Sequence, residues 1–205
     1  MADPRRSSPS FTIEDHARRV GNYRWIEMKL FETLGGWVPV IPELDVKLRL
    51  GTQSHHHAWH AELWEQRLPE LREMERDGLT RPANDLVVAF VDALNEPRAP
   101  ELTLEKLVGV FRVLLPHKIA TYSFHLHATS PIADAPTRRA LRFMLQDECD
   151  DWREGEALVQ SLLATPDDVQ RAGAHQARLE TLLVQAGGIA GPGSVGPLTS
   201  TEAVA

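Results

Sequence analysis

The sequence predicts an all-α fold, a bundle of four long helices with one long crossover connection and an additional C-terminal helix. Apolar residues recur with helical periodicity along most of the chain, and no convincing two-residue alternation indicates a strand. The breaks in this periodicity coincide with Gly and Pro residues. Two pairs of long helices are each joined by a short connection, which is the layout of a helical bundle.

The first pair of helices is bounded by Gly and Pro signals. We expect the first helix over residues 12–34, because Gly35 and Gly36 follow as a strong C-terminal signal. The second helix follows Pro42 and continues to about Leu68. Because the connection between them is short, the two helices should lie antiparallel.

A connection of about 33 residues then leads to the second pair. Within it, residues 84–97 ("NDLVVAFVDALNEP") predict a short helix opened by Asn84 or Asp85, although the Val-rich centre leaves a strand open. The third long helix should cover residues 102–128. It is apolar on most of its circumference and interrupted by Pro116, which predicts a buried helix with a kink.

Two more helices complete the predicted fold. The fourth long helix begins at Asp134, a suitable N-cap, has Pro136 near its first turn, and runs to about Leu163. The final helix starts at Thr165, has two acidic residues in its first turn, and ends at Gly187.

The domain organisation follows from composition. Residues 12–186 should form one helical domain, since a chain of 205 residues with 42% hydrophobic residues can bury its own core. Residues 1–11 and 187–205 lack apolar periodicity and are rich in small and polar residues, so we expect both to be mobile tails.

Charge and motifs exclude several classes of protein. A net charge of -7 argues against nucleic-acid binding, and we find no stretch apolar enough to span a membrane. The single cysteine, Cys149, and the lack of an export signal favour a reducing cytoplasm. The sequence contains no Gly-rich phosphate loop, G-x-S-x-G, paired C-x-x-C or H-E-x-x-H motif, which argues against hydrolases, kinases and dehydrogenases.

Two carboxylates fall on the apolar faces of their helices. At about 100° per residue, Glu27 shares one direction with Ile13, Val20, Phe31 and Leu34. In the fourth long helix, Glu148 shares one direction with Leu141, Leu145, Trp152 and Val159. Burying an ionised carboxylate in such a place is costly unless it is paired or binds a metal. We therefore expect one common cause for the burial of both glutamates.

The stretch "GTQSHHHAWHAELW" (residues 51–64) carries four of the nine histidines. The apolar residues of this helix are Val46, Leu50, Trp64 and Leu68. Their direction predicts that Gln53 and His57 point inward. It places His60 at the rim, His56 further round, and His55 on the outside with Trp59. The four histidines therefore cannot share one role.

Counting residues from the two short connections tests whether the candidates lie at one depth. At 1.5 Å per residue, polar candidates on all four long helices share a layer to within about one turn. The candidate metal ligands in this layer are Glu27, His56, His57, His117, Glu148 and Asp151.

With this pattern, residues 12–163 resemble the ferritin-like superfamily. Its dimetal-carboxylate members use Glu on the first helix, Glu-x-x-His on the second, Glu on the third and Glu-x-x-His on the fourth. Glu27 matches the first position, "QSHH" (residues 53–56) has Gln in place of Glu, and His117 stands where the third-helix Glu is expected. "ECDD" (residues 148–151) has Asp in place of the final His, so ligand identity holds at three of six positions.

These replacements remove negative charge that two adjacent divalent ions need. A single ion, iron or another divalent metal, held by Glu27, His56 or His57, and Glu148 suits the remaining ligands. The resemblance then implies an oxidoreductase in which reduced metal binds dioxygen and a small organic substrate sits between the helices.

The alternative is a non-catalytic ferritin-like protein that has lost its metal and serves as a structural or partner-binding subunit. In that case Arg24 or Lys118 would pair with the two buried glutamates, and the inward histidines would be hydrogen-bonded core residues. In either case the protein could form a two-fold symmetric homodimer.

Overall fold

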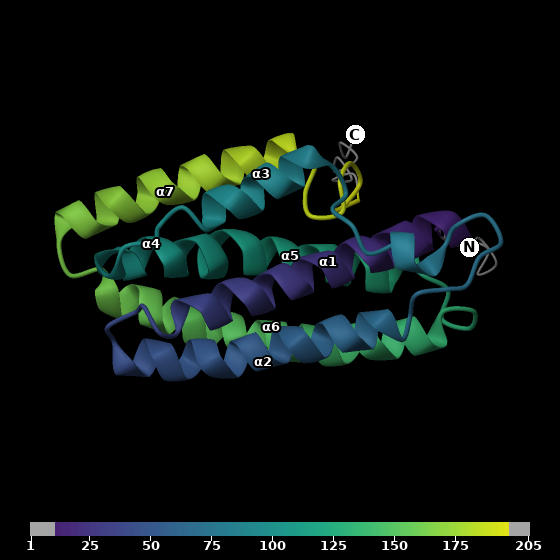
Figure 1. Ribbon diagram of the computed structural model, residues 1–205, viewed down its shortest axis with the longest axis horizontal. Coiled ribbons are helices and arrows are strands. Elements are labelled where there is room, and N and C mark those ends of the chain that lie inside the picture. Colours follow the sequence, from purple (N-terminus) through teal and green to yellow (C-terminus); the bar gives the residue numbers. More distant parts are fainter. Residues whose placement is uncertain (1–10, 197–205) are drawn as a thin grey trace, which may run out of the picture.

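The computed structural model describes residues 11–196, and the chain over this range is helical (Figure 1). The α-helices are α1 (Ile13–Trp37), α2 (Leu44–Glu65), α3 (Asp85–Leu94), α4 (Thr103–Val108), α5 (Leu115–Ala128), α6 (Ala135–Leu162) and α7 (Pro166–Gln185). Two short 3-10 helices span Arg76–Gly78 and Pro100–Leu102, and a π-helical segment, Gly109–Leu114, joins α4 to α5. No strand occurs among these residues, so the predicted all-α class is confirmed.

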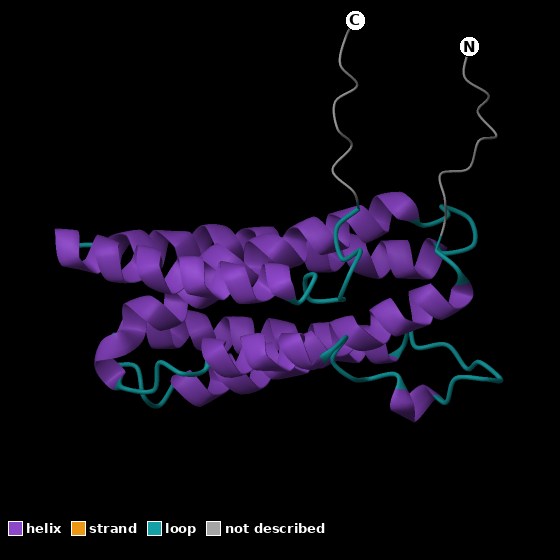
Figure 2. Cartoon of the chain, turned by 90° about the horizontal axis from the view of Figure 1, so that it is seen from above, coloured by secondary structure: helices purple, strands orange, loops and turns teal. Residues whose placement is uncertain are grey.

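Four long rods run side by side, with α4, the π-helical segment and α5 forming one of them (Figure 1). Helix α1 packs against α2, α5 packs against α6, and α2 also contacts α6. The connection from α2 to α4 carries α3, and α7 packs against α3 and α4 on one side of the bundle. The loop-rich part of this connection lies at one end of the rods (Figure 2). Among the described helices, none is both long and apolar enough to cross a membrane.

Helix α1 begins as expected and ends later than expected. The Thr12 hydroxyl accepts a hydrogen bond from the backbone N–H of Asp15, which caps the helix. The helix continues through Gly35 and Gly36 to Trp37, whose side chain is buried in the core. Burial of this large side chain outweighs the weak helical preference of the two glycines.

The rod that contains Pro116 avoids a break by changing its helical geometry. Proline lacks an N–H, and its ring would clash with the carbonyl four residues earlier in an α-helix. The wider π-helical segment precedes it, and the N–H of Leu115 donates to the carbonyl of Val110, five residues back. Gly155 of α6 lets this segment approach closely, since a Cβ there would overlap the ring of Phe111.

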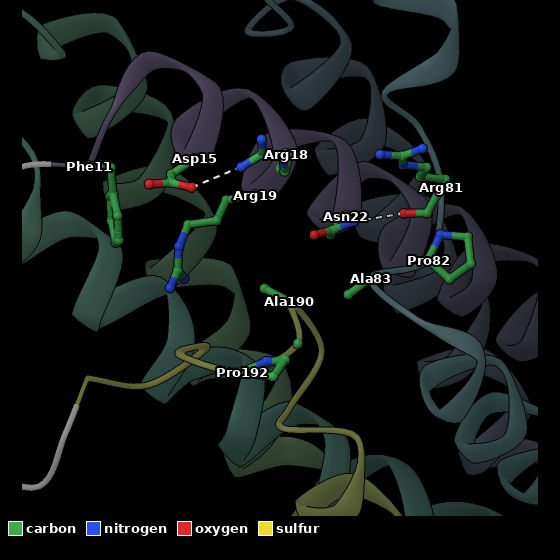
Figure 3. A pocket seen from close by; sticks show the side chains of 11 residues that line it. Phe11, Asp15, Arg18, Arg19, Asn22, Arg81, Pro82, Ala83, Ala190 and Pro192 are labelled. Carbon is green, nitrogen blue, oxygen red and sulfur yellow. Dashed lines mark hydrogen bonds and ion pairs between the residues drawn. The ribbon is translucent and has the colours of Figure 1, made fainter. Parts of the chain in front are cut away.

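Residues 187–196, expected in a mobile tail, form turns that pack against the bundle. Gly187 and Gly188 adopt positive φ angles of 73° and 86°, which favour glycine, and Ile189 is fully buried. The Arg19 guanidinium donates to the carbonyls of residues 193 and 194, and Figure 3 shows Arg19 pointing from α1 toward this segment. The folded part of the chain therefore extends at least to residue 196. Residues 1–10 and 197–205, the remainder of the expected tails, lie outside the described residues.

Candidate metal centre

A group of ionisable side chains meets in the middle of the bundle, where each is fully buried. We call this group the central cluster. Its members are Glu27 of α1, His57 and His60 of α2, Lys118 and Tyr122 of α5, and Glu148 of α6. Because buried charges are costly unless they are paired or bind a metal, the contacts among these side chains determine what the cluster can do.

Lys118 lies between the two buried carboxylates. Its Nζ is 2.7 Å from Oε2 of Glu27 and 2.6 Å from Oε1 of Glu148. Burial would lower the pKa of Lys118, but the two carboxylates raise it above its usual value, so the amine is an ammonium. Pairing of both glutamates with Lys118 is therefore confirmed. Arg24 instead pairs with Glu65.

Glu27 is held from several directions. The hydroxyl of Tyr122 donates to Oε1 of Glu27 at 2.6 Å, and the indole N–H of Trp64 donates to the Tyr122 oxygen at 3.1 Å. Burial would raise the pKa of Glu27, but the Lys118 ammonium, the hydrogen bond with His57 and the nearby His60 lower it well below its usual value. Glu27 is thus an ionised carboxylate with a fixed orientation.

The two cluster histidines have different protonation. Nδ1 of His57 lies 2.9 Å from Oε2 of Glu27, and burial together with the Lys118 ammonium lowers its pKa, so it is neutral. Burial acts on His60 in the same direction, but the hydrogen bond with Asp147 and the nearby carboxylates of Glu148 and Glu27 raise the pKa of His60 well above its usual value. In this arrangement Lys118 and protonated His60 together offset the two buried carboxylates.

Several ligand atoms of the cluster make no hydrogen bond within residues 11–196. They are Nε2 of His57, Nδ1 of His60 and both carboxylate oxygens of Glu148, although Oε1 of Glu148 lies in the ion pair with Lys118. Buried polar atoms without hydrogen bonds are uncommon in native proteins, and an unseen ion is one explanation for them. Glu27, His57, His60 and Glu148 can each offer one ligand atom within 4.8 Å of the others.

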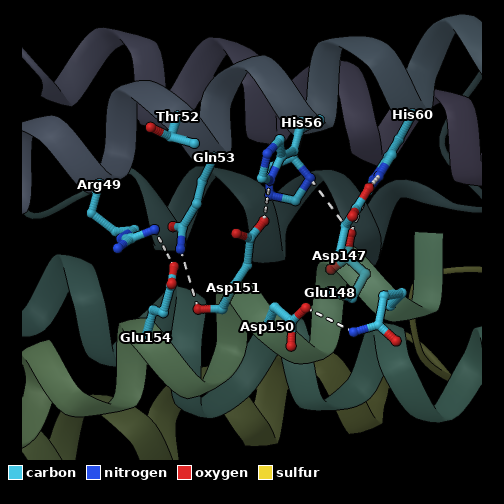
Figure 4. Close-up of polar contacts among 12 residues, drawn as sticks. Arg49, Thr52, Gln53, His56, His60, Asp147, Glu148, Asp150, Asp151 and Glu154 are labelled. Carbon is cyan, nitrogen blue, oxygen red and sulfur yellow. Dashed lines mark hydrogen bonds and ion pairs between the residues drawn. The ribbon is translucent and has the colours of Figure 1, made fainter. Parts of the chain in front are cut away.

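This set of four could therefore hold a metal ion. Two imidazoles and two carboxylates are ligands typical of zinc and non-haem iron. Asp147 supports the arrangement from outside the cluster, because its Oδ2 lies 3.1 Å from Nε2 of His60 and directs Nδ1 of that ring toward Glu148 at 3.2 Å (Figure 4). A carboxylate on the distal nitrogen commonly orients a metal-binding histidine.

The structure brings three predicted ligands, Glu27, His57 and Glu148, into the central cluster. His56 and Asp151 lie beside it and pair with each other, Nδ1 to Oδ2 at 2.9 Å (Figure 4). The backbone carbonyl of Asp151 also accepts a hydrogen bond from the inward Gln53. His55 is exposed, as expected.

His117 does not reach the cluster. Its Nε2 accepts a hydrogen bond from the N–H of Ile189 at 3.2 Å, and burial lowers its pKa to about 4. The neighbouring Lys118 points to the centre instead. The predicted third-helix ligand is thus replaced at the centre by a cation.

Sequence reasoning misplaced His60, which is fully buried and lies in the cluster rather than at its rim. The available signal was its spacing from His57, since residues three apart lie on one face of a helix. Lys118 and Tyr122 are similarly four residues apart on α5.

Comparison with known proteins gives no match to a family model, to a curated protein or to a solved structure. The function must therefore be inferred from the side chains themselves.

Proposed function

We propose that the protein binds one divalent metal ion through Glu27, His57, His60 and Glu148, and that with iron it is an oxidoreductase acting on a small organic substrate. The observation that carries the proposal is the convergence of four buried ligands, several of whose atoms lack hydrogen bonds. The ferritin-like pattern of the helices supports redox chemistry, because related layouts hold iron between carboxylates and histidines.

Bound iron would supply one-electron redox chemistry with dioxygen, which these side chains do not provide alone. The chain's own residues orient the ligands. Tyr122 fixes one oxygen of Glu27, and Asp147 fixes the ring of His60. The complete burial of the four ligands keeps bulk water out of the centre, which strengthens the electrostatic attraction between carboxylate and cation.

Lys118 sets a condition on metal binding. Its ammonium lies between the carboxylates that would bind the ion, and two cations cannot share that place because of their repulsion. Metal binding therefore requires the Lys118 amine to move away from at least one glutamate. Its long, flexible side chain permits such a movement. Metal binding also requires His60 to release its proton, because only a neutral imidazole binds a metal ion.

The test is elemental analysis of the untagged protein after expression with added iron and zinc. We expect one metal ion per chain in the wild type, loss of the ion in Glu27→Gln and Glu148→Gln, and retention in His55→Ala. His55 is an exposed histidine on the same helix as two of the ligands, so it controls for loss of imidazole alone. Circular dichroism should show that all three variants are folded. A wild-type protein without metal in both media would refute the proposal.

A second candidate is a metal-free structural or partner-binding subunit. The observation that favours it is the Lys118 ammonium, which already neutralises the buried carboxylates as a metal ion would. This candidate predicts wild-type protein that is free of metal and fully folded, and the same elemental analysis distinguishes the two.

A further inference from the structure

A polar cavity lies away from the central cluster, between the start of α1, the chain before α3 and the turns after α7 (Figure 3). Its volume is about 390 Å³. This is near the lower end of the range for ligand pockets, so the cavity suits a small molecule. The charged and amide side chains on its wall are those of Asp15, Arg18, Arg19, Asn22 and Arg81.

The wall of this cavity carries excess positive charge. Three arginines and one aspartate line it, which leaves two positive charges uncompensated on the wall. Among residues 11–196, Arg18 is the only one of the three that forms an ion pair, through its Nη1 to Oδ1 of Asp15 at 3.0 Å. The chain as a whole carries a net charge of -7, so the charge on the wall of this cavity is opposite in sign to the net charge of the chain.

Arg19 is the buried member of the three, with 9% of its surface exposed. It donates to the carbonyls of Gly193 and Ser194 and to the Tyr23 hydroxyl, and it lies 4.3 Å from the ring centre of Phe11. Within residues 11–196 no carboxylate forms an ion pair with it. Carbonyl oxygens and an aromatic face offset only part of the cost of burying a guanidinium. A buried arginine without a counter-ion therefore retains a positive charge that an anion can neutralise.

Arg81 stands on the opposite side of the cavity from Arg19 (Figure 3). Its backbone is anchored, because Nδ2 of Asn22 donates to the Arg81 carbonyl at 2.9 Å. Its side chain is exposed and makes no ion pair in the described part of the chain. Arg19 and Arg81 thus line the same cavity from different segments of the chain. The exposed Arg81 side chain is long and flexible, so it can turn toward an anionic group in the cavity, and a guanidinium can donate parallel hydrogen bonds to a carboxylate or a phosphate.

We propose that this cavity binds a small organic anion through a carboxylate or phosphate group, with Arg19 and Arg81 as its cationic partners. The anionic group of the ligand would neutralise the positive charge of Arg19, and the ligand would contact the turn that contains Ala190. None of the cavity residues belongs to the central cluster, so the site does not depend on metal binding.

Isothermal titration of the full chain with inorganic phosphate and, separately, with succinate at low ionic strength tests this. We expect at least one of the two anions to bind the wild type. Arg81→Gln should weaken that binding about tenfold or more, because a charged hydrogen-bonding partner is lost while the backbone contact to Asn22 remains. The anion that binds tells whether the group recognised is a phosphate or a carboxylate.

Arg139→Gln is the matched control, because Arg139 is an exposed arginine of α6 that does not line the cavity. It should bind the anion as the wild type does. Failure of both anions to bind the wild type overturns the proposal, as does equal weakening in Arg81→Gln and Arg139→Gln. The result is independent of metal content, which can be varied in the same assay with a chelator.

Discussion

The ammonium nitrogen of Lys118 lies 2.7 Å from Oε2 of Glu27, so a cation from α5 meets a carboxylate from α1 at the centre of the bundle. The same nitrogen also pairs with Glu148. A protein-borne cation thus lies between the two carboxylates that a metal ion would need. Under the proposed function, the ammonium and the metal ion compete for these carboxylates, and this competition can be measured.

Lys118→Met should destabilise the metal-free protein and strengthen metal binding. Removing the ammonium leaves two buried carboxylates short of a partner, which costs about 3–5 kcal/mol in the free energy of unfolding. Under the proposed function, an added divalent metal ion recovers this loss, because binding to the folded state stabilises it. Urea unfolding with and without Zn²⁺ measures both effects.

Lys29→Met is the control for this substitution. Lys29 lies on α1 with a partly exposed side chain and forms a surface ion pair with Glu32, so its loss should change the free energy of unfolding by less than about 1 kcal/mol. Equal stability of Lys118→Met and the wild type would show that the buried ion pair is not a determinant of the fold.

Asp147→Asn should weaken metal binding without unfolding the protein. The Asp147 carboxylate accepts from Nε2 of His60 and orients the ring, and loss of such an orienting group costs roughly 10–100-fold in metal affinity. Asp150→Asn, an exposed position on the same helix, should leave the affinity unchanged. Competition with a chromophoric chelator gives both affinities. Matching affinities in the two variants would speak against His60 as a ligand.

Gly155→Ala should destabilise the bundle, and Gly173→Ala should not. A Cβ at Gly155 would overlap the ring of Phe111, whereas a Cβ at Gly173 on α7 meets no atom within 4 Å. Overpacking costs about 1–3 kcal/mol, while Gly→Ala at an open helical site stabilises by roughly 0.5–1 kcal/mol. Thermal melts of the two variants should shift in opposite directions, and a shared direction would contradict the close approach of α6 to the π-helical segment.

Acid should loosen the contact between His117 and the turn that contains Ile189. Burial lowers the pKa of His117 to about 4 from 6.5, so the folded state resists protonation. Stability from this group is complete above pH 6.5 and falls as the pH decreases toward 4, by about 1.4 kcal/mol per pH unit.

Urea unfolding at pH 7 and pH 5 measures this effect. His117→Gln keeps an acceptor for the Ile189 N–H and should lose roughly 1–2 kcal/mol less than the wild type over this interval. His127→Gln, at an exposed histidine of the same helix, should behave as the wild type does. If the free energy of unfolding of His117→Gln decreases between pH 7 and pH 5 as much as that of the wild type, the decrease must arise from other titrating groups.

The helices and the inward glutamates could be predicted because each depends on residues close together in the chain. Apolar periodicity alone places Glu27 and Glu148 on buried faces, and both are fully buried. Contacts between distant segments could not be predicted in this way. Residues 187–196 look like a tail by composition, yet Ile189 is buried because Arg19 and His117 provide hydrogen-bonding partners from other helices.

The burial of His60 was missed for a similar reason. The apolar residues of its own helix place His60 at the rim, whereas its polar partners, Asp147 and Glu148, lie on α6. A histidine near the edge of an apolar face can be drawn inward when a neighbouring helix supplies carboxylates.

The π-helical segment Gly109–Leu114 acts as if a single residue had been inserted into the rod before Pro116. A turn closed by bonds to the fifth residue contains one residue more than an α-helical turn, so everything after it is rotated back by roughly 100°. In an uninterrupted α-helix, His117 would face the direction that Lys118 now takes. One additional residue thus replaces a neutral imidazole by an ammonium opposite Glu27. It adds a positive charge to the centre of the protein.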